Sequence, residues 1–460
     1  MLRRALTPLV LLALAVLLTT GAVPTTFVSR TEDPSAATDR PLSRPPSLLA
    51  AALAPDVAAS ASNPLDARIA DLQRALRRDG TASALLEALG WAFVHKARLS
   101  SDHGYHLLAD RCARAMLDAD PQSTAALLLR GHVLHSLHRF AEAKAVAADL
   151  VARRGSPLDH ALHGDVLLDL GRLGEAARAY QRMMNRRPDS RAFARTAEVR
   201  ILTGDLDGAR QALRTAARAA SARDAESFAW VWSRLAIVEL QSGSNEEALA
   251  IAEAAVAAAP DSAVAALAHG RVLLALRGSE AATASLEKSA ALSPLPDTLR
   301  ALAEAYEASG RSADAARTLA RLEAVGESAD PRGFSIWLSE SGRETTRALA
   351  LAQAEIAKRR DVFTLAALAL AESVAGRNDS ARRHIAEALA HGTEDPRLWY
   401  HAALVAERSG ETVEARAWFS KAGSQASLLL PSLRRHVLEK LSAADALVPA
   451  AEVAGPAGAA

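Results

Sequence analysis

The sequence predicts an all-α fold in which helical hairpins stack into a solenoid. Aromatic residues make up only 4% of the 460 residues and alanine is abundant, a composition typical of helices that pack closely through small side chains. Small residues also recur with a period of 33 or 34 residues. A period of this length is typical of helix-turn-helix arrays, whose hairpins must stack because a single hairpin cannot bury its apolar face alone.

Charge and cysteine content limit the classes of function. The 54 basic and 53 acidic residues give a formal net charge of +1, so the chain has no global basic field and nucleic acid is not a default partner. Cys112 is the single cysteine. One thiol excludes an internal disulfide and a CxxC metal site.

Residues 1–23 are expected to be a signal peptide or an N-terminal membrane anchor. Arg3 and Arg4 precede a mainly apolar run from Leu6 to Val23, and a basic start before an apolar stretch is typical of export segments. The arginines favour a cytoplasmic N-terminus with the rest of the chain outside. We favour an uncleaved anchor over a cleaved signal, because the run leads directly into Pro24. A buried helix of the fold is the less favoured alternative.

The remaining boundaries follow from composition. Residues 24–63 are rich in Pro, Ala and Ser and are expected to be a linker. Residues 64–81 hold an amphipathic helix that is expected to cap the array at 82–427, and 428–446 hold a second capping helix. The tail at 447–460 is rich in Ala, Gly and Pro and is expected to be flexible.

The repeat is visible in a series of alanines. Successive members are 34, 33, 33, 39, 34, 33, 33, 33 and 34 residues apart. The one long step crosses residues 217–229, where extra residues lengthen a connection. The series is Ala109, Ala143, Ala176, Ala209, Ala248, Ala282, Ala315, Ala348, Ala381 and Ala415.

Glycines supply a second marker, five or six residues before these alanines, where the first helix of each hairpin must turn into the second. Glycine suits such a turn because it accepts positive φ. A further small residue, usually 12 residues before the alanine, is expected to let the two helices approach closely. The turn glycines are Gly171, Gly204, Gly243, Gly310, Gly342, Gly376 and Gly410.

This pattern resembles the tetratricopeptide repeat family. The resemblance covers about residues 82–427 in roughly ten copies, and it implies a right-handed superhelical solenoid. The first copy has about seven extra residues around Leu99 to Tyr105, and the eighth copy, 331–358, is off by one in its turn. The residues expected at the family's packing positions are Gly131, Ala143, Gly164, Ala176, Tyr180, Pro188, Ala209, Trp232, Ala236, Ala248, Ala282, Ala315, Ala381, Trp399, Ala403 and Ala415.

The whole chain also resembles bacterial tetratricopeptide proteins of undefined activity. Two segments carry this resemblance, "LGWAFVHKARLSSDHGYHLLADRCARAMLDADP" near the start of the array and "GTEDPRLWYHAALVAERSG" near its end. It therefore implies a bacterial envelope protein but no reaction.

The family geometry implies which residues face the concave groove: those one and four positions after the small residue of each first helix. The wall they form is mixed, with aromatic and histidine residues first, apolar residues next and acidic residues near Glu304, which suits a peptide held by apolar anchors and a few charges. These partner-binding residues are Trp91, Val94, His132, His135, Asp165, Leu168, Glu198, Ile201, Ile237, Leu240, Arg271, Leu274, Glu304 and Glu307.

Histidines give an alternative. Eight of the 13 lie between His95 and His163, and converging imidazoles can bind zinc or copper. No HExxH motif supplies a recognised ligand set and no nucleophile or phosphate-binding motif is present. We therefore expect no catalytic residue, no metal and no cofactor.

The sequence as a whole predicts a non-catalytic scaffold or adaptor that holds a protein or peptide partner in its concave groove, outside the cytoplasm. Two other hypotheses remain open: a repeat array used only as a spacer or oligomerisation scaffold, and a metal-binding or hydrolytic protein that uses the histidine-rich repeats. The identity of the partner, the pathway and the oligomeric state are not predicted.

Overall fold

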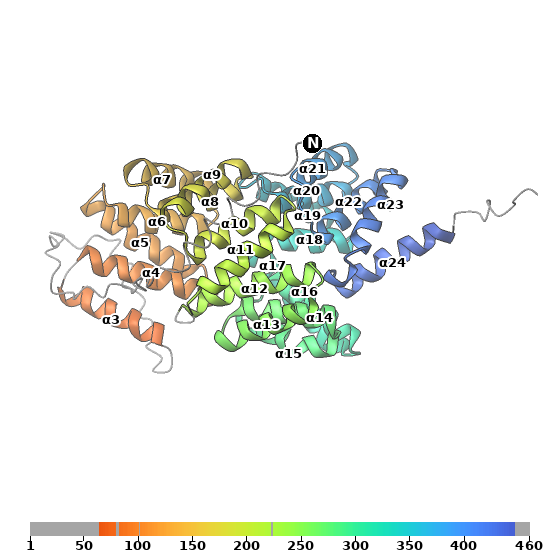
Figure 1. Ribbon diagram of the computed structural model, residues 1–460, viewed down its shortest axis with the longest axis horizontal. Coiled ribbons are helices and arrows are strands. Elements are labelled where there is room, and N and C mark those ends of the chain that lie inside the picture. The colour runs from red at the N-terminus through yellow and green to blue at the C-terminus, as the bar shows by residue number, and fades with distance from the viewer. Residues whose placement is uncertain (1–63, 80–81, 101, 222–223, 447–460) are drawn as a thin grey trace, which may run out of the picture.

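The computed structural model describes residues 64–79, 82–100, 102–221 and 224–446. These residues form helices α3 to α24 and one 3-10 turn, η2, and they contain no strand (Figure 1). The prediction of an all-α helical solenoid is confirmed. The segments predicted to be a signal or anchor, a linker and a flexible tail lie outside the described residues.

Helices α4 to α23 pair into ten successive antiparallel hairpins, with α3 (Pro64–Asp79) before them and η2 (Ala426–Leu428) and α24 (Pro431–Ala446) after them. The hairpins are α4 (Ser83–Ser100) with α5 (Gly104–Ala119), α6 (Thr124–Ser136) with α7 (Phe140–Arg153), α8 (Pro157–Asp169) with α9 (Leu173–Arg186), α10 (Ser190–Leu202) with α11 (Leu206–Ala219), α12 (Ala225–Gln241) with α13 (Asn245–Ala258), α14 (Ala263–Leu276) with α15 (Ser279–Leu292), α16 (Pro296–Ala308) with α17 (Ser312–Ala329), α18 (Pro331–Ser341) with α19 (Thr345–Ile356), α20 (Val362–Val374) with α21 (Asn378–Leu389), and α22 (Pro396–Arg408) with α23 (Thr412–Gly423).

The two helices of each hairpin occupy different layers. Most neighbouring hairpins pack directly through their first helices, as α12 does with α14, α18 with α20 and α20 with α22. Within the described chain, second helices of neighbouring hairpins do not pack on one another in this way. The first helices therefore lie at the smaller radius and form the concave wall, while the second helices lie outside.

Small residues set the distance between the helices of a hairpin. A Cβ atom at Gly164 on α8 would overlap the ring of Tyr180 on α9, and one at Gly131 on α6 would lie 3.3 Å from Val146 Cγ1 on α7. The alanines of the repeat series are fully or almost fully buried between helices, as are Ala236, Ala403 and Trp399. Trp232 is only partly buried, and Pro188 is exposed just after α9 ends.

Longer helices absorb two of the irregularities in the repeat, the one in the first copy and the one near residues 217–229. In the first copy, α4 continues to Ser100, so most of the extra residues extend the helix and not the turn. The long step near 217–229 is divided between the connection after Ala219 and an early start of α12 at Ala225. His138 has a positive φ of 56° at the turn where other hairpins carry glycine.

The superhelix closes on itself. The turns that follow α8, α10 and α12 contact the connections that follow α19, α21 and α23, so the yellow-green repeats of Figure 1 lie against the blue ones. The amide of Arg360 donates to the carbonyl of Asp169 (3.2 Å), and Thr393 Oγ1 donates to the carbonyl of Leu202 (2.6 Å). Gln241 Nε2 donates to the carbonyl of Glu394. We call this line of contact the seam.

Two turn glycines allow the backbones to meet at the seam. A Cβ atom at Gly171 would collide with the carbonyl oxygen of Arg360, and one at Gly204 with that of Gly392. Gly310 and Gly376 have the same left-handed conformation, but a Cβ atom there would meet nothing within 4 Å. Glycine is therefore needed at Gly171 and Gly204 for two reasons: φ is positive there, and a side chain would collide with the facing backbone.

In the described part of the chain, no helix is both long and apolar enough to span a bilayer.

We expect Gly164→Ala to destabilise the array by about 1–3 kcal/mol, because the added methyl overpacks the contact with Tyr180. Gly174→Ala is the matched control: it lies in the first turn of α9, where the nearest side-chain atom to an added Cβ is Arg178 Nη1 at 3.8 Å, and it should be neutral or stabilise by about 0.4–1 kcal/mol. Urea unfolding followed by circular dichroism measures both. Equal effects of the two substitutions would contradict the packing role of Gly164.

Candidate functional site: the concave wall

The predicted groove residues divide into two groups. Val94, Leu240 and Leu274 are buried in the apolar core between helices, so they are not open anchors as the sequence interpretation assumed. Adjacent helices cover these three side chains, because each hairpin packs on the next. The other positions keep part of their surface free: Trp91, His132, His135, Asp165, Leu168, Glu198, Ile201, Ile237, Arg271, Glu304 and Glu307.

Charged side chains on neighbouring first helices pair across the wall. Asp165 on α8 accepts two hydrogen bonds from Arg195 on α10, at 2.8 and 2.7 Å, and a third from the hydroxyl of Tyr180 at 2.9 Å. Burial raises the pKa of this carboxyl, but the charge and hydrogen bonds of Arg195 outweigh it, so the pKa of Asp165 is lowered. Asp165 therefore remains ionised and fixed.

The same arrangement continues along the wall. Glu198 on α10 accepts two 2.7 Å hydrogen bonds from Arg234 on α12, and Arg271 on α14 pairs with Asp297 on α16. Asp165, Glu198 and Arg271 were predicted wall residues, whereas their partners Arg195, Arg234 and Asp297 were not predicted. A signal was available for two of them, since Arg195 and Arg234 each stand two residues before the small residue of their helix.

Histidines line the N-terminal end of the wall. His132 packs edge-on against Trp91 with ring centroids 5.2 Å apart, and burial lowers the pKa of His132 to about 3. His135 Nε2 lies 2.7 Å from Asp169 Oδ2. Burial alone lowers the pKa of His135, but the hydrogen bond and charge of Asp169 more than compensate, so its pKa is raised. Of these two, only His135 can gain a proton in mildly acidic surroundings.

At the C-terminal end the wall curves tightly enough to bury a charge network. Glu340 on α18 pairs with Arg300 on α16 and lies 2.7 Å from His401 Nε2 on α22. Burial raises the pKa of the Glu340 carboxyl, but Arg300 and His401 outweigh burial and lower it to about 2. Three first helices are thereby tied together by one carboxylate.

A cavity of about 440 Å³ opens beside this network. Glu304 and Glu307 of α16, Trp337 of α18 and Tyr400 of α22 form part of its lining, and the first turns of α24 complete it. The amide and hydroxyl of Ser432 donate to the Glu304 carboxylate at 2.9 and 2.8 Å. The chain's own C-terminal helix thus occupies the acidic part of the groove.

The histidines do not converge. Within the residues that the structure describes, no group of three or more His, Cys, Asp or Glu side chains is placed to hold a metal ion. His132 and His135 have the partners given above, while His160 is buried on α8. Cys112 is fully buried, and burial raises the pKa of its thiol to about 12, which does not fit a nucleophile.

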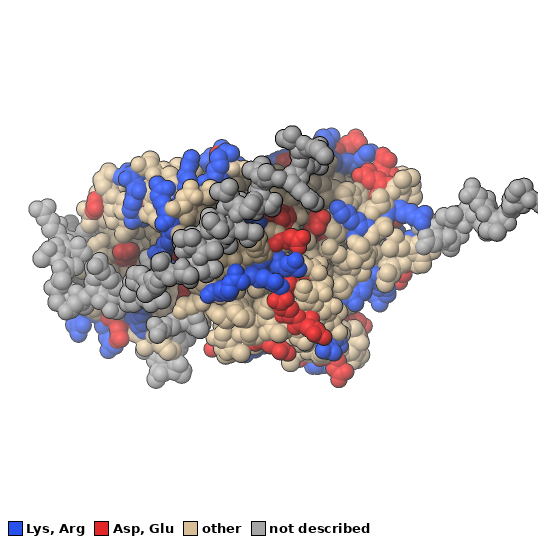
Figure 2. All heavy atoms as spheres, viewed as in Figure 1, with Lys and Arg blue, Asp and Glu red and all other residues tan. Residues whose placement is uncertain are grey.

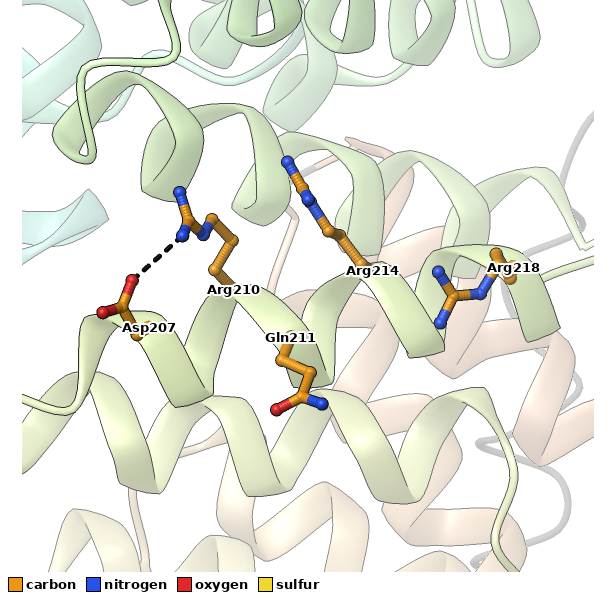
Figure 3. A pocket seen from close by; sticks show the side chains of 5 residues that line it. All are labelled: Asp207, Arg210, Gln211, Arg214 and Arg218. Carbon is orange, nitrogen blue, oxygen red and sulfur yellow. Dashed lines mark hydrogen bonds and ion pairs between the residues drawn. The ribbon is translucent and has the colours of Figure 1, made fainter. Parts of the chain in front are cut away.

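The outer layer has a second concavity of about 490 Å³ along α11 (Figure 3). Its described lining comes from α11 alone and includes Arg210, Arg214 and Arg218. These arginines are engaged: Arg210 pairs with Asp207, and Arg214 with Glu239 and Glu247. Figure 2 shows acidic and basic side chains interspersed over this face, so we place the candidate site on the concave wall.

The hairpin array and its inner wall define the class of protein, a helical-repeat solenoid. The family model described as tetratricopeptide repeat matches residues 162–225 and 366–427, which hold α8 to α11 and α20 to α23. These two stretches are tetratricopeptide repeats. This fold is one that serves in protein-interaction scaffolds.

Solved structures with a similar chain path include a tetratricopeptide repeat protein of Thermus thermophilus, TTC0263, with 21% identity over 42% of this chain and 100% of that chain (TM-score 0.37). Human IFIT1, in a dimer with PPP-AAAA, has 14% identity over 76% and 86% (TM-score 0.44). Yeast Tom70 has 12% identity over 83% and 96% (TM-score 0.35). No curated protein matches the sequence.

We expect Asp169→Asn to lower the pKa of His135, because it removes the carboxylate that opposes burial most strongly. In the native protein the raised pKa of His135 stabilises the fold below the unfolded-state pKa near 6.5, and this contribution is lost as the pH rises through the folded-state pKa. Ring NMR signals of labelled histidine measure the titration, with His132 uncharged throughout. The control is Asp118→Asn, which removes an exposed carboxylate and should leave the titration of His135 unchanged. An unchanged His135 titration in Asp169→Asn would exclude the proposed pairing.

Proposed function

We propose that this protein is a non-catalytic scaffold that holds a segment of a partner protein against its concave wall. One observation carries the proposal: the wall already holds a helical segment, the chain's own η2 and α24. The first turn of α24 lies beside α16, and its last turn points away from the array (Figure 1). The concave wall therefore has the shape and chemistry to accept an amphipathic helix.

The contacts of this internal segment show how the wall holds a helix. Leu433 and Val437, one turn apart, are buried in the same apolar cluster as the wall residue Trp337. Glu304 accepts the hydrogen bonds from Ser432 in the first turn of α24. The negative charge of this carboxylate also complements the positive end of the helix dipole. His436 Nδ1 lies 2.8 Å from the hydroxyl of Tyr400. Apolar burial supplies affinity, and the two polar contacts fix the position of the helix along the wall.

The wall from α4 to α12 carries no such internal segment among the described residues. Its free surface combines Trp91, Ile201 and Ile237 with the paired charges of Asp165 and Glu198. Because these carboxylates are neutralised by Arg195 and Arg234, a partner does not have to supply the opposite charge. This part of the wall suits a segment with apolar anchors and uncharged polar groups.

We further propose that the array works outside the cytoplasm, at the cell envelope of a bacterium. The basic start and the apolar run at residues 1–23 support export or anchoring. The alternative of a metal-binding or hydrolytic protein has no observation in its favour, since the described histidines do not form a ligand set.

Capture from an envelope extract tests the binding proposal. We expect the full chain to retain a partner that is lost by the wall variant Trp91→Ala, Ile201→Ala, Ile237→Ala, because these side chains supply the open apolar surface. The matched control Arg178→Ala, Arg182→Ala, Arg186→Ala changes exposed residues of α9 and should capture the partner normally. Circular dichroism verifies that both variants are folded. Equal capture by the two variants would exclude the concave wall as the site.

Export is tested separately with a reporter enzyme fused after Pro64. We expect the fused reporter to be active only outside the cytoplasm. The arginines before the apolar run favour a cytoplasmic N-terminus, so the fusion point after the run would lie on the other side of the membrane. Deleting residues 1–23 should abolish that activity. Activity of the intact fusion in the cytoplasm would refute the proposed location.

A further inference from the structure

The seam joins two parts of the array through few and mostly polar contacts. Its hydrogen bonds involve the backbone of Asp169 and Leu202 on one side and Arg360 and Thr393 on the other. Arg359, which is 8% exposed, lies 4.0 Å from Asp169 across the seam. Apolar contact comes from Leu202, which packs against the cluster of α20 to α22, and from Leu428 of η2, which packs against the cluster of α10 to α14.

Contacts between neighbouring hairpins are of a different kind. They bury continuous apolar clusters, such as the one in which Leu134 of α6 and Phe140 of α7 share a core with Leu162 of α8. Because each hydrogen bond contributes little net free energy and little apolar surface is covered at the seam, the seam holds its two sides less strongly than a buried apolar cluster holds neighbouring hairpins. Small rotations at many hairpin junctions add up along a solenoid, so the seam can open while every hairpin stays packed.

The closed seam limits entry to the space inside the superhelix. When two turns of the wall touch, a chain segment reaches this space either by threading through an end or by passing between the turns. At the C-terminal end, α24 lies across α16 and is held by Glu304. A segment in the middle of a folded partner cannot thread at all, because it has no free end.

We propose that the seam is a gate: it opens reversibly, with the hairpins intact, to admit an internal segment of a partner protein to the concave wall. The gate is formed by three successive contacts, Gly171 with Arg360, Gly204 with Gly392 and Thr393, and Gln241 with Glu394 and Gln425. This inference rests on the proposed function for the nature of the cargo, but the opening itself is a property of the chain alone.

Thiol labelling of the full chain tests the opening without any partner. Thr393 is 3% exposed and covered at the seam, so Thr393→Cys places a thiol that reacts with N-ethylmaleimide only when the gate opens. Cys112 is fully buried within the array and serves as the internal reference for global unfolding. We expect the introduced thiol to react at least tenfold faster than Cys112 under native conditions.

Glycine substitutions identify the seam as the gate. In the Thr393→Cys background, Gly204→Ala should raise the labelling rate about tenfold over Gly376→Ala. The two glycines share a φ of 74°, so the backbone strain is equal, and only the first collides with a facing carbonyl. If Gly204→Ala does not fold, Gln241→Ala removes the third contact and should raise the rate several-fold, with the exposed Gln211→Ala on α11 as its control.

Two results would overturn the proposal. Labelling of the introduced thiol at the rate of Cys112 would mean that Thr393 is reached only by global unfolding. Rapid labelling that responds equally to Gly204→Ala and Gly376→Ala, or to Gln241→Ala and Gln211→Ala, would mean that the seam does not shield the thiol. Either outcome leaves partner capture by the wall untouched, so failure of the gate is distinct from failure of the scaffold function.

Discussion

Close approach of two helices at a small residue is the constraint on which the rest of this structure depends. Gly164 lies against the Tyr180 ring, and the alanine series is buried in the same way in the other hairpins. This fixes the thickness of every hairpin and keeps successive hairpins alike. Rotations from one hairpin to the next add up along the array, so that it curves and returns to its own earlier turns.

Charge pairing then determines the chemistry of the wall. Carboxylates on one first helix are neutralised by arginines on the next, as Asp165 is by Arg195 and Glu198 by Arg234. Glu340 joins three helices. Such pairs add little net stability when partly exposed, but they fix the spacing of the wall and leave apolar side chains as its open surface.

The C-terminal segment and the seam both restrict the concave space, by different physical means. The segment from η2 to α24 is held through apolar burial around Leu433 and Val437 and by the carboxylate of Glu304. The seam is held by backbone contacts at Gly171 and Gly204, with little apolar area. Access to the wall therefore depends on a firmly packed plug at one end and on a weak lateral contact along the side.

The sequence by itself determined the repeat, its hairpins and the family, because helical periodicity, turn glycines and crossing alanines act over distances shorter than one hairpin. The resemblance to the tetratricopeptide repeat family also implied which helix face is concave, and so placed Asp165 and Glu198 on the wall. Only the tertiary structure decided that Val94, Leu240 and Leu274 are covered, that Glu304 caps α24, and that Gly204 meets Gly392. Those contacts join residues up to 188 positions apart (Gly204 to Gly392). They arise from the summed rotation of many hairpins, a quantity that no local pattern encodes.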